Sequence, residues 1–567
     1  MTLDTTRRRF IRDLTLGSTA IGAGLGLGGC GGSDDEASDA GAGVEFRHGV
    51  ASGDPLSDRV ILWTRVSPSA ADATLQLGWE VASDAQFSSI LKSGSVRTSA
   101  AQDHTAKVDV TGLAANTVYH YRFTIGSKRS PAGRTRTLPV GSVSQVRLAV
   151  FSCSNYPAGY FNVYAEAAKR LDFDAWLHLG DYIYEYDSTG YATGNAAALN
   201  RVPVPANETL TLADYRARYA QYRGDPDLQA LHAAAPLIAV WDDHEVANDT
   251  WTGGAENHDP ATEGSFAARR AAAIQAYLEW IPIRVPDASQ PDRIYRSFDF
   301  GNLLSLHMLD TRQVGRDQQL SYASYITAAG FDAAGFASAV GNPARQLMGA
   351  TQTAWLQSQL QASTATWQVL GQQVLMGRMN VPAPIVTQQI SVAAYGALAQ
   401  KAATAPATLT VAEQAILAQP SIPYNLDAWD GYAAARETVL GMARTLDKNL
   451  VSLAGDTHNA WASDLRDASG TAVGVEFATS SVTSPGFEAI FTTEAPAALA
   501  AALTQLIDPL QYAQTSLRGY LLLDLTPAAA RADWVFVDTI LSRGYAASTG
   551  QSLRTLPGAA NRKLIDV

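Results

Sequence analysis

Four apolar segments that each run directly into polar, reactive side chains constrain the fold of this chain more than any other feature. Long stretches rich in alanine separate them, as the helices between the strands of an α/β protein would. Parallel strands in such proteins are buried on both faces, so they read as continuous apolar runs. We therefore predict an α/β domain with buried strands at 147–151, 174–179, 236–241 and 449–454.

The residues that follow these four segments carry the chemistry. Because the carboxyl ends of strands in α/β sheets converge on the ligand site, we expect the four ends to meet. Together they offer thiolate, phenolate and imidazole groups, which suit a trivalent or borderline transition ion, and extra carboxylates, which suit Ca²⁺ or Mn²⁺. Each motif alone is also typical of a turn or a helix cap, so the prediction depends on all four. They are Cys153-Ser154-Asn155, Gly180-Asp181-Tyr182-Ile183-Tyr184, Asp242-Asp243-His244-Glu245 and Gly455-Asp456-Thr457-His458.

Short alternating segments broken by Gly, Pro, Asn and Asp precede this region. They predict an N-terminal β-sandwich domain of the fibronectin type at 46–140. The α/β catalytic domain is then expected at 146–545, followed by a C-terminal tail at 546–567. An Ala/Gln-rich stretch at 383–420 indicates a helical insertion.

The first thirty residues are typical of an export signal. The segment 6–12, Thr-Arg-Arg-Arg-Phe-Ile-Arg, matches the twin-arginine pattern, and a weakly hydrophobic run at 14–29 follows it. The segment 27–30 resembles a bacterial lipobox in which Cys30 would be lipidated; the alternative is a cysteine near an ordinary cleavage site. We therefore predict a signal peptide at 1–30 and a flexible tether at 31–45. The expected partner is the twin-arginine translocase. The expected location is the periplasm or cell surface, with a membrane tether through Cys30.

Composition and missing motifs exclude several classes of protein. The chain has 42 Lys and Arg against 54 Asp and Glu, a net charge of −12, which gives no general attraction for nucleic acid. We therefore expect no specific nucleic-acid partner. The two cysteines, Cys30 and Cys153, exclude a disulfide scaffold. The sequence also lacks the motifs of serine hydrolases (Gly-x-Ser-x-Gly), zinc proteases (His-Glu-x-x-His) and P-loop proteins.

Taken together, the motifs resemble those of the PhoD-type alkaline phosphatase/phosphodiesterase family, a branch of the calcineurin-like metallophosphoesterases. The resemblance covers nearly the whole chain after the signal. It implies a catalytic domain built as an αββα sandwich and the hydrolysis of phosphate mono- and diesters by metal-activated water. Besides the four motifs it rests on the segments Arg47–Pro55, Leu62–Arg65, Leu309–Arg312, Glu476–Ser481 and Arg518–Tyr520.

The same resemblance implies the ligands. An Fe³⁺ ion would be held by Cys153, Asp181, Tyr184 and His458, and Ca²⁺ ions would share the remaining carboxylates, Asp243 and Asp456. Relative to the wider superfamily, a cysteine motif replaces Asp-x-His and Asp242-Asp243-His244 replaces Gly-Asn-His. These departures make a site for two Zn²⁺ or two Mn²⁺ ions the weaker alternative.

Three further residues are predicted to act on the substrate. His244 follows a ligand in its motif and is expected to contact a phosphate oxygen or the leaving group, while Asn155 and Arg312 are candidate phosphate contacts. Asp242 and Glu245 either support the ligands or lie in a solvated loop. Two other histidines, His178 and His307, lie within apolar strands, where packing in the core is the expected role.

Three functional hypotheses follow. The first is an exported phosphatase and phosphodiesterase that scavenges phosphate from small phosphate esters. The second is a dedicated phosphodiesterase that acts on phospholipids or on phosphodiester-linked wall polymers. The third is a non-catalytic surface lipoprotein that uses its N-terminal module for adhesion. The complete set of ligands argues against the third, because a degenerate relative would have lost some of them.

Overall fold

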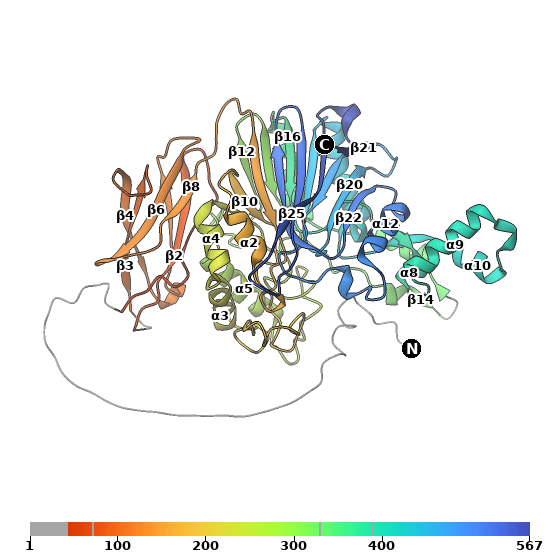
Figure 1. The fold of residues 1–567 in the computed structure, drawn as a ribbon, viewed down its shortest axis with the longest axis horizontal. Helices are drawn as coiled ribbons and strands as arrows, with labels where there is room; N and C mark the ends of the chain where they lie inside the picture. The colour runs from red at the N-terminus through yellow and green to blue at the C-terminus, as the bar shows by residue number, and fades with distance from the viewer. Residues whose placement is uncertain (1–42, 71–72, 328–329, 388) are drawn as a thin grey trace.

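A computed structural model describes residues 43–70, 73–327, 330–387 and 389–567. The predicted signal peptide, most of the predicted tether and Cys30 lie outside the described residues. Two large sheets form the centre of the protein, and a smaller strand-rich module lies at one end (Figure 1). Within the described residues, no helix combines the length and the apolar character needed to cross a membrane.

The larger sheet has ten strands. Its order is β26-β25-β24-β23-β9-β10-β11-β1-β2-β5, and β9, β10 and β11 are parallel. The apolar sequence of β9, VRLAVF, is buried at five of its six positions, as expected for a strand covered on both faces. The strand bounds are β26 (Ile565–Asp566), β25 (Ala547–Thr555), β24 (Ala530–Val537), β23 (Arg518–Leu525), β9 (Val146–Phe151), β10 (Ala175–His178), β11 (Leu237–Ala239), β1 (Val50–Gly53), β2 (Arg59–Arg65) and β5 (Thr105–Thr111).

The second sheet has seven strands in the order β12-β13-β16-β19-β21-β20-β22. Its central strands β13, β16, β19 and β21 are parallel. The strand bounds are β12 (Arg296–Phe300), β13 (Leu304–Met308), β16 (Trp367–Gly371), β19 (Leu450–Ala454), β21 (Ala472–Ala478), β20 (Ala460–Arg466) and β22 (Leu510–Gln514).

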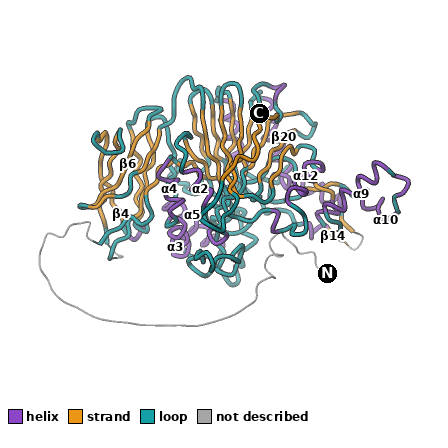
Figure 2. The backbone as a smooth tube through the Cα atoms, viewed as in Figure 1, coloured by secondary structure: helices purple, strands orange, loops and turns teal. Residues whose placement is uncertain are grey.

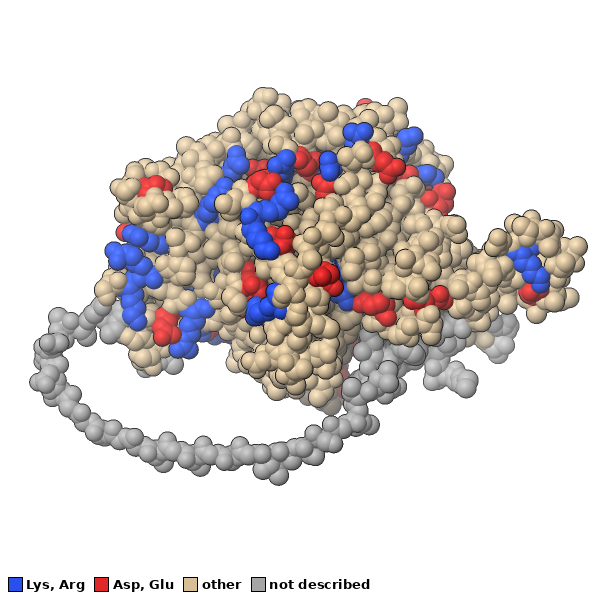
Figure 3. All heavy atoms as spheres, in the orientation of Figure 1, with Lys and Arg blue, Asp and Glu red and all other residues tan. Residues whose placement is uncertain are grey.

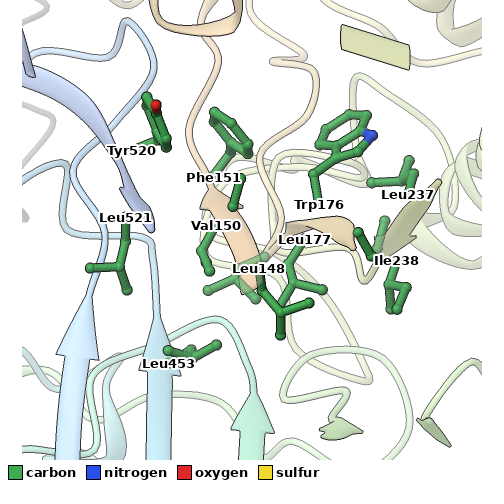
Figure 4. Packing of buried hydrophobic residues seen from close by; sticks show 14 of the residues in the cluster. Leu148, Val150, Phe151, Trp176, Leu177, Leu237, Ile238, Leu453, Tyr520 and Leu521 are labelled. Atoms are coloured by element: carbon green, nitrogen blue, oxygen red, sulfur yellow. The ribbon is translucent and has the colours of Figure 1, made fainter. Parts of the chain in front are cut away.

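One hydrophobic core joins the two sheets. Leu148 of β9, Leu177 of β10 and Leu453 of β19 belong to the same buried cluster, whereas Phe151 and Trp176 point to the opposite side of the larger sheet (Figure 4). Side chains in a strand alternate between the two faces, so the larger sheet contributes to a layer on each side.

Helices cover the outer faces of both sheets and complete the predicted αββα sandwich, which is confirmed (Figure 2). The helices α2–α5 share the core of the larger sheet, and α7, α11 and α12 share a second core with the smaller sheet. The bounds are α2 (Asn162–Ala168), α3 (Leu212–Arg223), α4 (Pro226–Ala234), α5 (Phe266–Trp280), α7 (Gly349–Ala362), α11 (Ala433–Thr445) and α12 (Pro496–Leu506).

The predicted insertion at 383–420 is helical and projects from the body (Figure 1). Its only charged residues, Lys401 and Glu413, pair with each other at 2.7 Å, and the projection is otherwise without charge (Figure 3). It contains α8 (Ala383–Val386), α9 (Val392–Thr404) and α10 (Val411–Leu417). Nearby lie α6 (Ala333–Val340) and two hairpins, β14 (Ile326–Thr327) with β15 (Gly330–Phe331) and β17 (Asn380–Pro382) with β18 (Ser421–Pro423).

The N-terminal module is a two-layered β structure, but it is not separate from the catalytic part. Its strands β1, β2 and β5 continue the ten-stranded sheet, since β1 pairs with β11 at Gly53 and Leu237. The predicted boundary between two domains therefore corresponds to a shared sheet. The second layer of the module contains β3 (Leu75–Ala82), β4 (Ile90–Thr98), β6 (Val118–Ile125), β7 (Lys128–Arg129) and β8 (Gly133–Arg136).

The prediction of a C-terminal tail at 546–567 is wrong. These residues contribute β25 and β26, and β25 pairs along its length with β24. The misassignment arose because β25, sequence ASTGQSLRT, is mostly polar and exposed at its first four residues, so no apolar pattern marks it as a strand.

Candidate metal centre

The four predicted strand ends meet at one end of the two packed sheets. Three of the motifs follow the parallel strands β9, β10 and β11 of the larger sheet, and the fourth follows β19 of the smaller sheet. Four of the predicted ligands adopt the left-handed backbone conformation that non-glycine residues rarely use: Cys153 (φ 61°), Asp181 (φ 57°), Asp456 (φ 60°) and His458 (φ 62°). Strained backbone of this kind clusters at functional sites, where the surrounding structure holds it in place.

Gly180 explains why two of these motifs can lie so close together. Its φ is +110°, and a Cβ atom at this position would lie 2.2 Å from the Cβ of Asp242. Only glycine therefore allows the loop after β10 to pass against the loop after β11.

The first group of candidate ligands contains Cys153, Asp181 and His458, whose ligand atoms all lie within 4.8 Å of one another. Tyr184 completes it, because its hydroxyl lies 2.8 Å from Asp181 Oδ2 and 3.1 Å from His458 Nε2. All four side chains are buried. The donors are thus a thiol, a carboxyl, a phenol and an imidazole, which is the set predicted from the sequence.

The orientation of His458 is fixed by the carbonyl of Pro485. Nδ1 lies 2.8 Å from this oxygen and donates its proton to it, which leaves Nε2 facing Tyr184 and Asp181. The hydroxyl of Tyr191 lies 3.1 Å from the same Nδ1, and the two rings stack at 6.1 Å. His458 therefore presents Nε2 as the atom that can bind a metal ion.

The second group contains Asp181, Asp243 and His244, so Asp181 belongs to both groups. His244 Nδ1 lies 2.6 Å from Glu185 Oε2, and both side chains are fully buried. The ring of His244 also stacks on that of Tyr184, with 4.2 Å between centroids. Its remaining nitrogen, Nε2, lies 3.9 Å from Asp243 Oδ2 and faces the carboxylates.

The third group contains Asp242, Asp243 and Asp456. It differs from the other two because the guanidinium group of Arg312 lies beside all three of its members. Arg312 Nε donates to Asp242 Oδ1 at 2.5 Å, and Arg312 Nη2 lies 3.6 Å from Asp243 Oδ1. The side chain of Arg312 is fully buried, so in this structure it contacts carboxylates rather than an open phosphate pocket.

Burial dominates the electrostatics of the ligands. It raises the pKa of the Cys153 thiol, the Asp181 carboxyl and the Tyr184 phenol well above their ordinary values. The charge of Asp181 adds to the effect on Cys153 and Tyr184. Asp181 Oδ1 and Asp242 Oδ2 are buried and have no hydrogen-bond partner within the described residues. Such a donor set fits cations, because a cation would satisfy these oxygens and stabilise the ionised forms.

Comparisons with known proteins agree with this geometry. The family model for the PhoD-like phosphatase matches residues 148–534, and the model for the N-terminal domain of PhoD-like phosphatases matches residues 32–139. The chain belongs to the PhoD-like phosphatase family. It is therefore a hydrolase that acts on phosphate esters. The predicted family, fold class and reaction class are confirmed.

Two individual relatives extend this result. Alkaline phosphatase D of Bacillus subtilis (strain 168) is 36% identical over 526 residues, covering 89% of this chain and 80% of the relative. A solved structure described as "Structure of PhoD" superimposes with a TM-score of 0.74 at 33% identity, covering 94% of this chain and 93% of that one.

Within this PhoD-like centre, Glu245 is a buried support rather than part of a solvated loop. Its carboxylate accepts hydrogen bonds from the backbone N–H groups of Asp181 at 3.0 Å and Asp242 at 2.7 Å, and from that of Tyr182. It therefore joins the loops after β10 and β11. The sequence left both roles open, since only the fold shows which backbone groups reach Glu245.

Asn155 is buried beside the ligands. Its Nδ2 donates to the carbonyl of Tyr191 at 3.3 Å, and its Oδ1 is buried with no hydrogen-bond partner among the described residues. The residue also lines a narrow crevice together with Tyr184, Tyr186 and Tyr191. Its place is consistent with the predicted contact to phosphate, which stays a prediction.

The two histidines assigned to the core occupy it. His178 is buried on β10 and its Nε2 lies 2.9 Å from the hydroxyl of Tyr164, and burial lowers its pKa to about 3. His307 is buried on β13 and contacts Ser297 at 2.8 Å and Gln368 at 3.1 Å. Neither belongs to the candidate ligand groups.

Two residues of the centre were missed by the sequence analysis. Glu185 directly follows the ligand Tyr184 and was not considered separately. Asp427, which accepts from Arg312 Nη1 at 2.8 Å, lies in a loop far from any of the four motifs. The neighbouring segment Trp429–Tyr432 forms a buried turn of 3₁₀ helix.

Proposed function

We propose that this protein is an exported, metal-dependent alkaline phosphatase and phosphodiesterase that hydrolyses small phosphate mono- and diesters for phosphate scavenging. The observation that carries the proposal is the buried cluster of Cys153, Asp181, Tyr184 and His458, with Asp181 shared by the adjoining group of Asp243 and His244. A shared carboxylate is what neighbouring cations require of a bridging ligand.

The donor chemistry supports Fe³⁺ in the first group and Ca²⁺ near the carboxylates. Thiolate, phenolate and imidazole suit a ferric ion, and carboxylate oxygens suit calcium. When bound, these cations would stabilise the negative charge on the ester and lower the pKa of a water molecule. Zn²⁺ and Mn²⁺ are the weaker candidates, because neither explains the combination of Cys153 with Tyr184.

The protein's own groups would orient and stabilise the reacting ester. Glu185 fixes the ring of His244, whose Nε2 faces the carboxylates and can contact a phosphate oxygen or the leaving group. Asn155 would donate an amide N–H to an oxygen of the bound ester beside Tyr184. Tyr186 and Tyr191, which are half-buried at the crevice, would contact the alcohol portion of the substrate.

Export and attachment are supported by sequence alone. The twin-arginine pattern at 6–12 supports transport by the twin-arginine translocase, and Cys30 in its lipobox-like setting supports a lipid tether. Both support a location in the periplasm or at the cell surface. Such a location agrees with a role in recovering phosphate from external esters.

The test is the release of nitrophenol from p-nitrophenyl phosphate and from bis-p-nitrophenyl phosphate by metal-replete protein exported through its native route. Asp181→Ala serves as the blank. We expect hydrolysis of both esters, lost in the variant. Much faster turnover of the diester would instead support a dedicated phosphodiesterase. No release above the blank from protein shown to contain metal would contradict general esterase activity and favour a narrow substrate or the binding lipoprotein.

A further inference from the structure

Arg312 is surrounded by acidic side chains on the inner side of the metal centre. It follows β13, and its guanidinium group is fully buried. Arg312 Nη2 lies 3.6 Å from Asp243 Oδ1 and 3.7 Å from Asp456 Oδ1, and Arg312 Nε donates to Asp242 Oδ1. One fixed positive charge therefore lies within 4 Å of every member of the third candidate ligand group.

Among the described residues, the first group lacks such a charge, and the second lies beside it only at Asp243, which it shares with the third group. Within the residues that the structure describes, the only ion-pair partner of Asp181 within 4.0 Å is His458, at 4.0 Å. No Lys or Arg pairs with Asp181, which both of these groups share. The three groups thus differ in degree: Arg312 lies beside no member of the first group, beside Asp243 alone in the second, and beside every member of the third.

A second layer holds Arg312 in place. Arg312 Nη1 donates to Asp427 Oδ1 at 2.8 Å, and Nη2 lies 2.7 Å from Asp427 Oδ2 as an ion pair. Arg316 also donates to the Asp427 carboxylate and to the carbonyl of Thr311, so it restrains Asp427 in turn. Arg316 forms no ion pair with Asp242, Asp243 or Asp456 among the described residues.

Ca²⁺ requires six to eight oxygen ligands at about 2.3–2.6 Å. Between Asp242, Asp243 and Asp456 such an ion would have to share oxygens with a guanidinium group a few ångströms away, and the two positive charges would repel. Asp242 Oδ1 is already taken by a short hydrogen bond from Arg312. The group is therefore much poorer as a divalent site than its three carboxylates alone indicate.

We propose that Arg312 is a built-in cation of the centre that replaces a divalent ion at Asp242, Asp243 and Asp456. Bound metal ions are then confined to the two groups that share Asp181. This inference rests on the proposed function in so far as the centre binds metal ions. It assigns Arg312 a role in setting how many ions are bound, in place of the direct phosphate contact expected from its motif.

The test is a calcium titration by isothermal calorimetry of the full chain after removal of divalent ions by chelation. Arg312→Met removes the charge beside the acids. The matched control is Arg316→Met, which removes a buried arginine that contacts Asp427 but not the three acids. We expect Arg312→Met to bind one more Ca²⁺ per chain than the wild type, and Arg316→Met to bind the same number as the wild type. An unchanged or smaller number in Arg312→Met would overturn the inference.

A second measurement needs no variant, and so covers the case in which Arg312→Met does not fold. Crystals of the wild type soaked in Mn²⁺ should show anomalous scattering peaks beside Asp181 and none between Asp242, Asp243 and Asp456. A peak between these three acids would contradict the inference. Failure of this inference can be told apart from failure of the proposed function. If the wild type hydrolyses phosphate esters and Asp181→Ala does not, the enzyme is established, whatever number of ions it binds.

Discussion

Two regions that bury charged groups, the metal centre and the junction between the N-terminal module and the catalytic part, treat them in opposite ways. At the junction, Asp54 receives Arg296 through both ends of its guanidinium group, at 2.8 and 2.6 Å, and the backbone N–H of Arg284 at 2.6 Å. Lys107 donates to the carbonyls of Leu278 and Ile283. Asp54 and Lys107 are therefore both satisfied from within the chain.

In the metal centre, by contrast, the protein does not satisfy all of its buried carboxylates. Three candidate ligand groups share a few carboxylates, and among the described residues Asp181 and Asp242 each keep a buried oxygen without a hydrogen-bond partner. Buried carboxylates in this state are costly unless a cation or a proton neutralises them. The comparison teaches that a buried charge marks a functional site only where the surrounding protein leaves it unsatisfied.

The largest expected effect comes from removing the ligand that two groups share. Asp181→Ala should lower the turnover of p-nitrophenyl phosphate by about a thousandfold or more, since bound cations supply several kcal/mol of charge stabilisation. The free energy of unfolding of the metal-free variant should be no lower than that of the metal-free wild type, because Asp243 and Asp456 lose a repelling neighbour. Kinetics and urea unfolding measure the two quantities. A variant that loses stability and keeps its turnover would break the comparison.

The junction should give the reverse result. Asp54→Asn keeps the shape of the side chain and tolerates the left-handed backbone (φ 43°), but it leaves Arg296 without its ionic partner. Removing one member of a buried pair costs about 3–5 kcal/mol. We expect urea unfolding to show this loss while turnover of the folded enzyme stays close to wild type. Lost turnover at unchanged stability would show that the junction belongs to the active site.

Glu185 sharpens the comparison within the centre. Burial opposes its charge, but His244 and Arg269 outweigh burial and hold the pKa of Glu185 below its ordinary value. Glu185→Gln should reduce kcat by about 10–100-fold, the usual effect of losing a carboxylate that orients a histidine. The matched control, Glu208→Gln, alters a carboxylate that pairs with Arg269 and does not contact His244.

A double variant tests whether Glu185 acts by orienting His244 or through a general effect on the active site. If Glu185 acts through His244, Glu185→Gln should reduce kcat no further in a protein that already carries His244→Ala. Additive losses in the double variant would show instead that Glu185 acts independently of His244.

The smallest expected effect is a pH dependence at the junction. Burial lowers the pKa of Lys107 from 10.5 to about 7. Between these values the unfolded chain holds more protons than the folded one, so the free energy of unfolding should rise with pH, by at most about 1.4 kcal/mol per pH unit. Lys107→Met should flatten the rise measured by urea unfolding at pH 7 and pH 9. If the free energy of unfolding rises equally in Lys107→Met, the pH dependence comes from groups other than Lys107.

The sequence predicted the parts of the molecule where local pattern and tertiary structure agree. Buried parallel strands such as β9 are almost entirely apolar, and the ligands follow them immediately. Both the strands and the convergence of their ends could therefore be predicted. The helical insertion at 383–420 could also be predicted, because its Ala/Gln-rich sequence favours helix locally. The family resemblance then supplied roles for individual residues, from Cys153 to His458.

The remaining features depend on contacts that no local pattern encodes. The polar strand β25 is defined by pairing with β24, and the shared sheet depends on one short pairing between β1 and β11. Asp427 contacts Arg312 across 115 positions of sequence, and Arg312 was assigned to phosphate because its neighbours were unknown. Glu185 was overlooked because its partner His244 lies 59 positions away.

The account's central claim is that the centre around Asp181 is completed by metal ions and that the completed centre hydrolyses phosphate esters. The most direct measurement is turnover of p-nitrophenyl phosphate against the number of bound metal ions per chain, during chelation and during stepwise return of Fe³⁺ and Ca²⁺. The account predicts that activity disappears with the metal and returns in proportion to it, with Asp181→Ala inactive throughout. Undiminished turnover by protein shown to be free of metal would contradict it.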